Sequence, residues 1–386
     1  MAGYTNSLLE KFQFQKPQIN LARSSAVRMW LVNICAFMAI IQSSVSDSFS
    51  SLAVALGALI AAVLTEFLFL FKSGRVKQLL DGSAVATALI LTLLLPNRIS
   101  PLYAAVGAVF AIAVVKHSFG GLGSNWLNPA AGGWLFIRFS WPAVFNRALE
   151  GSPLSLLSEI SSRGITSPEG SPLGILKVDA AELFAVSTPL DTSFRTFLNN
   201  TIFSFTGAEL PGGYIDLFAS RFPGIIADRG VLALLVGSII ITASRANRFW
   251  VPAVYVAVVC FLVRLAGALP YGGEMWNGDV FFALCSGGTL TAAFFLSSDP
   301  STSAKSSVGI LLATVAGGVI CFCTRFFGAE PYGAVLAAVF INALLPLIRV
   351  LENRKLYDKR GIPLRSGANL SLSGVPADEA SSRRYS

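Results

Sequence analysis

The sequence predicts an all-α polytopic membrane protein, with about ten transmembrane helices in two inverted five-helix repeats that contain interrupted helices. Of its 386 residues, 54% are hydrophobic and 13% are charged, and the mean hydropathy is +0.65. A soluble domain carries about 25% charged residues. The basic residues behind the net charge of +8 are scattered between apolar runs. This composition excludes an ordinary soluble enzyme and a nucleic-acid-binding chain.

The predicted transmembrane helices are apolar segments of about 20 residues or somewhat fewer. They cover residues 26–44, 51–71, 83–95, 101–116, 129–145, 230–243, 248–268, 280–297, 307–326 and 332–351. The third is preceded by Asp81-Gly82-Ser83 and the eighth contains Ser286-Gly287-Gly288, and a proline closes each of them. Such segments at matching positions indicate discontinuous helices.

These two segments also indicate a duplication. Residues 81–96 (DGSAVATALILTLLLP) align with residues 285–300 (CSGGTLTAAFFLSSDP) without a gap, and a similar short segment, starting at His117 or Arg325, follows each at nearly the same offset. Self-similarity of this kind is typical of a repeated unit. Because each unit has an odd number of spans, the second copy enters the membrane from the opposite side.

Basic residues gather in one set of short loops, while the opposite loops are poor in them. By the positive-inside rule, this predicts that both termini are cytoplasmic. The chain then divides into a cytoplasmic N-terminal arm (1–25), a first membrane repeat (26–145), an extracytoplasmic insert (146–229), a second membrane repeat (230–351) and a cytoplasmic, disordered tail (352–386).

The loop KHSFGGLGSNWLNPA, residues 116–130, is a candidate binding loop. Its glycines let backbone N–H groups approach a ligand, and Asn125 and Asn128 offer both donors and acceptors. The alternative is a tight turn in which Asn and Pro only cap the next helix. A second candidate is Asp299, which could coordinate a cation, hold the edge of a flavin ring, or end a helix in cytoplasmic water.

Two further charges lie inside apolar segments. Glu66 and Arg264 could each serve in an ion path, snorkel to the interface, or pair with another buried charge. The chain has one histidine, His117, and its five cysteines form no CxxC pair. We therefore expect no metal or iron–sulfur site built from this chain alone.

Four segments, in this order, resemble one known family: DGSAVATALILTLLLP, KHSFGGLGSNWLNPA, SSDPSTSAKSSVGIL and PYGAVLAAVFINALLPLI. The chain is similar, from about residue 17 to 351, to the D subunit of the Rnf complex and to its paralogue, the B subunit of the sodium-pumping NADH:quinone reductase. The short N-terminal arm favours the Rnf type.

The resemblance implies a multi-pass subunit of a redox pump in the bacterial cytoplasmic (inner) membrane. Rnf passes electrons between reduced ferredoxin and NAD and couples this transfer to Na⁺ or H⁺ movement. The partners implied are the other Rnf-type subunits, and no complete reaction is expected from this chain alone. If only the repeats and interrupted helices are considered, without the family resemblance, a secondary transporter or channel with inverted repeats remains an alternative.

The resemblance also implies FMN joined through its phosphate to a threonine in a D-x-x-(S/T)-G-A-T type motif, by a flavin transferase, and it allows a non-covalent riboflavin. Aligning the motif puts Thr188 on the modified threonine, followed by Pro189-Leu190 as in the family. The chain departs from the motif at Glu182, Ala185, Val186 and Ser187. A family member without covalent flavin, serving as scaffold or ion path, is therefore a further alternative. The other flavin-binding candidates are Gly82, Ser83, Asn125, Asn128, Asp228 and Asp299.

Overall fold

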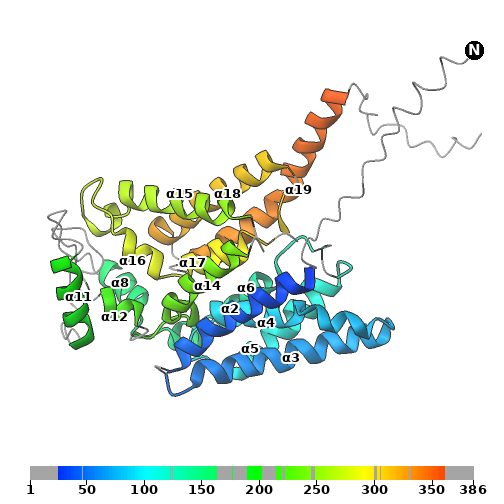
Figure 1. Cartoon of the computed structure of the whole chain (residues 1–386), viewed down its shortest axis with the longest axis horizontal. Helices are drawn as coiled ribbons and strands as arrows, with labels where there is room; N and C mark the ends of the chain where they lie inside the picture. Colours follow the sequence, from blue (N-terminus) through cyan, green and yellow to red (C-terminus); the bar gives the residue numbers. More distant parts are fainter. Residues whose placement is uncertain are drawn as a thin grey trace, which may run out of the picture.

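The computed structural model describes residues 25–360, apart from 46, 122, 124, 163–175, 177–188, 202–213, 220–221, 245–247, 300–301, 305, 329 and 331. The described part is helical, and its one β-type contact is an isolated bridge between Pro96 and Ile225. Figure 1 shows the N-terminal helices side by side in the lower half of the molecule and the C-terminal helices above them.

The first half follows the predicted segments closely. Its helices are α2 (Ser25–Val45), α3 (Ser50–Lys72), η1 (Val76–Asp81), α4 (Ser83–Leu94), α5 (Pro101–Phe110), its π-helical continuation η2 (Ala111–His117), α6 (Pro129–Ser140) and α7 (Pro142–Ala148). Small residues allow the helices to pack closely, as is common in membrane bundles. A Cβ on Gly133 of α6 would lie only 2.8 Å from the carbonyl oxygen of Gly107 in α5.

The second half repeats this pattern of long and interrupted helices. Its elements are α13 (Ile226–Arg229), α14 (Val231–Ala243), α15 (Trp250–Ala266), η4 (Leu269–Tyr271), α16 (Val280–Cys285), α17 (Thr289–Thr291), the π-helix η5 (Ala292–Leu296), α18 (Ser307–Phe322), the π-helix η7 (Cys323–Phe327) and α19 (Gly333–Arg360). The predicted interruption is real, because the chain leaves the helical path between α16 and α17 at Ser286–Gly288. Helix α19 continues to Arg360, past the expected end at residue 351.

Among the described residues, five helices are long and apolar enough to cross a membrane: Ala26–Val45, Ser50–Lys72, Trp250–Tyr271, Ser307–Phe327 and Gly333–Val350. Three shorter apolar helices, Ser83–Leu94, Pro101–His117 and Val231–Ala243, lie among them. The fifth predicted segment is shorter than expected, since α6 ends at Ser140 and Pro142 begins α7. The described insert contributes α8 (Pro153–Ser162), α11 (Pro189–Thr201) and α12 (Tyr214–Phe218), which Figure 1 shows together at one end of the molecule.

The segment before α13 joins the two halves. The backbone N–H of Ile226 donates to Leu95, just past the end of α4, at 2.9 Å, and Asn97 N–H donates to the Gly224 carbonyl at 3.0 Å. Helix α2 packs against both α4 and α14. The end of the first interrupted helix is therefore held against the start of the second half.

Candidate functional site

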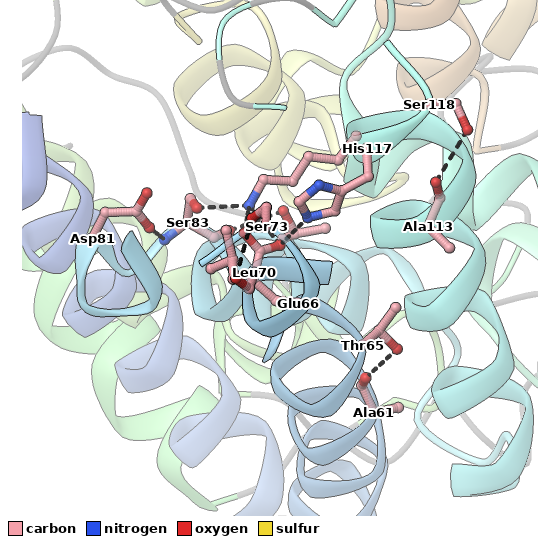
Figure 2. Close-up of polar contacts among 12 residues, drawn as sticks. Ala61, Thr65, Glu66, Leu70, Ser73, Asp81, Ser83, Ala113, His117 and Ser118 are labelled. Atoms are coloured by element: carbon pink, nitrogen blue, oxygen red, sulfur yellow. Dashed lines mark hydrogen bonds and ion pairs between the residues drawn. The ribbon is translucent and has the colours of Figure 1, made fainter. Parts of the chain in front are cut away.

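Four polar residues meet where the first interrupted helix begins, and we call them the α4 cluster: Glu66, Ser83, Lys116 and His117. The Lys116 ammonium donates to both carboxylate oxygens of Glu66 at 2.9 Å and to Ser83 Oγ at 2.7 Å. His117 Nε2 lies 3.1 Å from Glu66 Oε2. Figure 2 shows the His117 ring and Ser83 on either side of Glu66. The open question about Glu66 is thus answered, because its carboxylate pairs with Lys116.

Two consecutive residues of the π-helix η2 contact one carboxylate. In an α-helix neighbouring side chains point about 100° apart, whereas Lys116 and His117 both contact Glu66. Lys116 and His117 are the last two residues of the π-helical segment Ala111–His117. π-Bulges are rare and are often found at functional sites. The local conformation is therefore part of the cluster's construction.

Gly82 fixes the start of α4. It lies immediately before the helix with φ 78°, a left-handed conformation that glycine adopts without strain. Asn33 Nδ2 donates to the Gly82 carbonyl at 3.0 Å, and Trp30 Nε1 donates to the Leu80 carbonyl at 3.1 Å. Two contacts from α2 therefore hold the turn that presents Ser83 to Lys116.

The second interrupted helix carries a comparable arrangement around Arg325. This residue lies in the π-helix η7, and its guanidinium donates to Thr289 Oγ1, the first residue of α17, to Ser286 Oγ at 3.1 Å and to the Ala283 carbonyl at 2.7 Å. Gly288, with φ 69°, precedes the helix. Each half thus has a basic side chain from a π-helix bound to the first hydroxyl residue of a short helix.

This correspondence corrects the sequence alignment by a few residues. The gapless alignment pairs Gly82 with Ser286, whereas the left-handed residues that precede the short helices are Gly82 and Gly288. Lys116, rather than His117, has the role that Arg325 has in the second half. Glycine conformation and side-chain contacts reveal a register that sparse identity does not.

Asp228 lies against this second interruption. The backbone N–H groups of Gly287 and Gly288 donate to its two carboxylate oxygens at 2.8 and 2.9 Å. Asp228 belongs to α13, outside the membrane-spanning helices. Burial raises the pKa of its carboxyl to about 7, although the two backbone donors and Arg325 each lower it. The carboxyl is therefore set to change its charge near neutral pH.

The third polar group joins the asparagine loop to the second half. Asn128 Oδ1 accepts from the N–H groups of Ala130 and Ala131 and so caps α6, while its Nδ2 donates to Asp299 Oδ2 at 2.9 Å. Asn128 thus caps the helix, as the second alternative predicts, and also makes a long-range contact. Asn125 is 4% exposed, and neither its Oδ1 nor its Nδ2 has a hydrogen-bond partner among the described residues.

The sequence-derived candidates therefore fall in three places rather than one. Ser83 belongs to the α4 cluster, Asp228 to the second interruption, and Asn128 with Asp299 to the loop contact. Thr188 lies outside the described residues. Lys116 and Arg325 were missed as functional candidates, although a basic residue at the end of an apolar segment after each interrupted helix was visible in the sequence.

Comparisons with known proteins identify the family of the chain. The family model described as "NQR2, RnfD, RnfE family" matches residues 13–358. The D subunit of a complex named proton-translocating ferredoxin:NAD(+) oxidoreductase, from Clostridium ljungdahlii, is 28% identical over 333 residues, covering 86% of this chain and 91% of the relative.

Two other relatives have similar coverage. The D subunit of an ion-translocating oxidoreductase complex from Alcanivorax borkumensis is 32% identical over 78% of this chain and 83% of its own length. The D subunit of the Na(+)-translocating ferredoxin:NAD(+) oxidoreductase complex from Acetobacterium woodii is 27% identical over 88% and 93%. With its apolar helices and a family model that spans most of its length, the chain is a multi-pass membrane protein of the NQR2, RnfD, RnfE family.

Proposed function

We propose that this protein is the flavin-carrying membrane subunit of an Rnf-type complex that couples ferredoxin:NAD electron transfer to Na⁺ or H⁺ translocation. The observation that carries the proposal is the family match over residues 13–358, together with relatives named as the D subunit of such complexes. The relatives' names include both a proton-translocating and a Na⁺-translocating complex, so the coupling ion is left open.

The proposal includes the membrane arrangement. We infer ten membrane segments in two inverted repeats, with both termini on the cytoplasmic side of the bacterial inner membrane and the insert outside. Support comes from the matching contacts of Lys116 with Ser83 and of Arg325 with Thr289. Support also comes from the basic residues Lys72 and Arg75 at the end of α3, which belong to the basic set of loops.

We infer that a non-covalent flavin contacts the asparagine loop at Asn125. The pyrimidine edge of a flavin presents alternating carbonyl oxygens and an N–H group, and the Asn125 amide offers an unpaired donor and an unpaired acceptor in a buried position of the described structure. A buried amide without partners costs about 1–3 kcal/mol, so a bound ligand edge would recover stability. Asn128 and Asp299 hold the loop in place through their hydrogen bond.

When bound, a flavin accepts two electrons and releases them singly, which suits a relay between one-electron and hydride carriers. In this chain, Asn125 would bind and orient the ring edge. Asn128 would fix the loop against Asp299 and keep the start of α6 intact. A covalent phosphoester on Thr188, made by a flavin transferase, would keep FMN at the outer surface.

The test is fluorescence of the purified protein after denaturing electrophoresis, with a flavin transferase from the same cell co-expressed. We compare wild type, Thr188→Ala and the control Thr192→Ala, which removes an exposed threonine of α11. A fluorescent band that only Thr188→Ala loses is expected. No band in any protein, with a transferase active on another substrate, would refute covalent attachment and favour the scaffold or ion-path alternative.

Acid-extractable flavin tests the second site independently. We expect flavin in extracts of Thr188→Ala and its loss in Thr188→Ala/Asn125→Ala, with Asn200→Ala, in the insert, as the asparagine control. Unchanged extractable flavin in the Asn125 variant would refute binding at this loop. Absence of both flavins from a folded protein would favour the transporter alternative.

A further inference from the structure

The α4 cluster contains an ion pair at a buried position, where such a pair contributes little to the stability of the fold. Glu66 and Lys116 lie in apolar helices, with side chains 4% and 2% exposed. Ionisable groups at such positions are expensive and mark proton or ion routes more often than structural contacts. Replacing a buried ion pair by apolar residues is often neutral or stabilising. Stability alone is therefore a weak reason for this cluster.

The cluster also places a cation at an unfavourable end of a helix. Lys116 Nζ lies 2.7 Å from the hydroxyl of Ser83, the first residue of the 12-residue helix α4. The N-terminus of a helix carries a partial positive charge, which repels cations and attracts anions. Lys116 is compensated there by the ionised Glu66, whose two oxygens it contacts. The position of Lys116 thus depends on the charge of Glu66.

His117 lies between this carboxylate and the surface of the protein. Its side chain is 15% exposed, its ring stacks on the partly exposed Phe69 at 4.6 Å, and its Nε2 lies 3.1 Å from Glu66 Oε2. Glu66 lies six residues before Lys72 at the end of α3, or about 9 Å along the helix. That end belongs to the basic loops, which the positive-inside rule places in the cytoplasm.

We propose that His117, Glu66 and Lys116 form a proton-exchange site that links water on the basic-loop side to the start of α4. A water-borne proton binds His117 Nδ1, and the proton on Nε2 passes to Glu66 Oε2. The Nε2–H bond breaks, the O–H bond of the carboxylic acid forms, and the imidazole is left neutral in its other tautomer. Glu66 then no longer compensates Lys116, so the ammonium is driven away from Ser83.

The other charged groups near Glu66 do not form ion pairs with its carboxylate in the described part of the chain. Those on α3 itself and on the elements packed against it are Lys72, Arg28 in α2, Lys77 and Asp81 in η1, and the phenol of Tyr103 in α5. Asp81 Oδ1 accepts the backbone N–H of Ser83 at 2.7 Å. Within the described part of the chain, the ion pairs of Glu66 are those with Lys116 and His117.

The test uses the full-length protein in nanodiscs, purified through a tag without histidine. Because His117 is the one histidine of the chain, ¹⁵N-histidine labelling gives a single imidazole to follow by NMR. We expect its tautomer to differ between the two ends of a pH series from about 5 to 8, with the Nε2–H form at the alkaline end. Infrared difference spectra over the same range should show the C=O band of a protonated, buried carboxylic acid.

Variants assign these signals. The protein with Glu66 intact and the Glu66→Gln variant are compared in an Asp228→Asn background, because Asp228 also changes its charge near neutral pH. There Glu66→Gln is expected to remove a carboxylic acid band, because it removes the carboxyl that receives the proton. Glu330→Gln, which removes the carboxylate paired with Arg138 at 2.9 Å, is the matched control and should leave both signals unchanged. If Glu66→Gln fails to fold, the double variant Glu66→Gln/Lys116→Met serves for the band assignment.

Two outcomes would overturn the proposal. One is a wild-type imidazole whose tautomer does not change across this pH range, which would make the cluster a fixed ion pair. The other is a set of infrared difference spectra, in the Asp228→Asn background, from which Glu66→Gln removes no carboxylic acid band. Neither measurement requires flavin or the other subunits, so the proposal can fail or stand independently of the proposed function.

Discussion

The buried pair between Glu66 and Lys116 is expected to show strong energetic coupling. We consider the single variants Glu66→Gln and Lys116→Met and the double variant. Each single change leaves one charged group in a site where both side chains are under 5% exposed, which typically costs about 3–5 kcal/mol. The double variant removes both charges and retains similar volumes, so we expect it to lie within about 1 kcal/mol of wild type.

The assay is unfolding in mixed micelles with increasing SDS, followed by circular dichroism and tryptophan fluorescence on the same samples. The coupling energy is the double-variant effect minus the sum of the two single effects. The Arg138–Glu330 pair provides a matched control, because its atoms are also 2.9 Å apart but its side chains are 17% and 18% exposed. Its coupling should be below about 1 kcal/mol.

Strong coupling would be refuted by single variants that each lose less than about 1 kcal/mol, the range of an exposed pair. It would also be refuted by a double variant whose loss equals the sum of the single losses. The first result would mean that water solvates Lys116, and the second would mean that the two charges do not compensate each other.

The second half and the asparagine loop allow three further predictions. Gly287→Ala should destabilise the protein by roughly 1–3 kcal/mol more than Gly74→Ala. Both glycines have φ near +70°, but only at Gly287 would a Cβ lie 2.7 Å from Arg325 Nε. Equal losses of stability in the same unfolding assay would contradict this. Asp228→Asn should flatten a fall in stability between about pH 4 and 7. A carboxyl whose folded pKa is raised from 3.8 to about 7 stabilises the fold below pH 4 and loses that contribution as pH rises through the folded pKa. An unchanged pH profile of the unfolding midpoint would disprove this. Asn128→Ala should lower the free energy of unfolding by about 1 kcal/mol because the helix cap is lost. The purified variant should also contain less acid-extractable flavin than wild type. Asn128→Ser should retain most of the stability.

The two interruptions share part of their geometry but not their acidic partners. In each half a basic side chain holds the first turn of a short helix, at Ser83 through Lys116 and at Thr289 through Arg325. The companion acids differ, because Glu66 contacts the base directly whereas Asp228 binds backbone N–H groups. The two interruptions therefore share a basic side chain at the short helix but differ in what their acidic residue binds.

The positions of the helices were determined by local sequence. Apolar length, the prolines at 101 and 129, and the glycines before the short helices are signals that act within a few residues. For this reason the predicted segments 51–71, 83–95 and 307–326 agree closely with the helices observed. The Asn128 cap was likewise recognisable from its Asn-Pro dipeptide.

The contacts that make up the candidate sites were decided by tertiary structure. Asn128 and Asp299 are 171 residues apart in the chain, and Glu66 and Lys116 are 50 apart. In a membrane helix an apolar surface faces lipid and core alike, so hydrophobic periodicity does not reveal which neighbours pack together. The π-helical turn that places Lys116 and His117 on one carboxylate is not encoded by any local propensity that we recognise. It is retained because the surrounding helices provide the partners, and this long-range packing is the physical reason that the cluster became visible only in three dimensions.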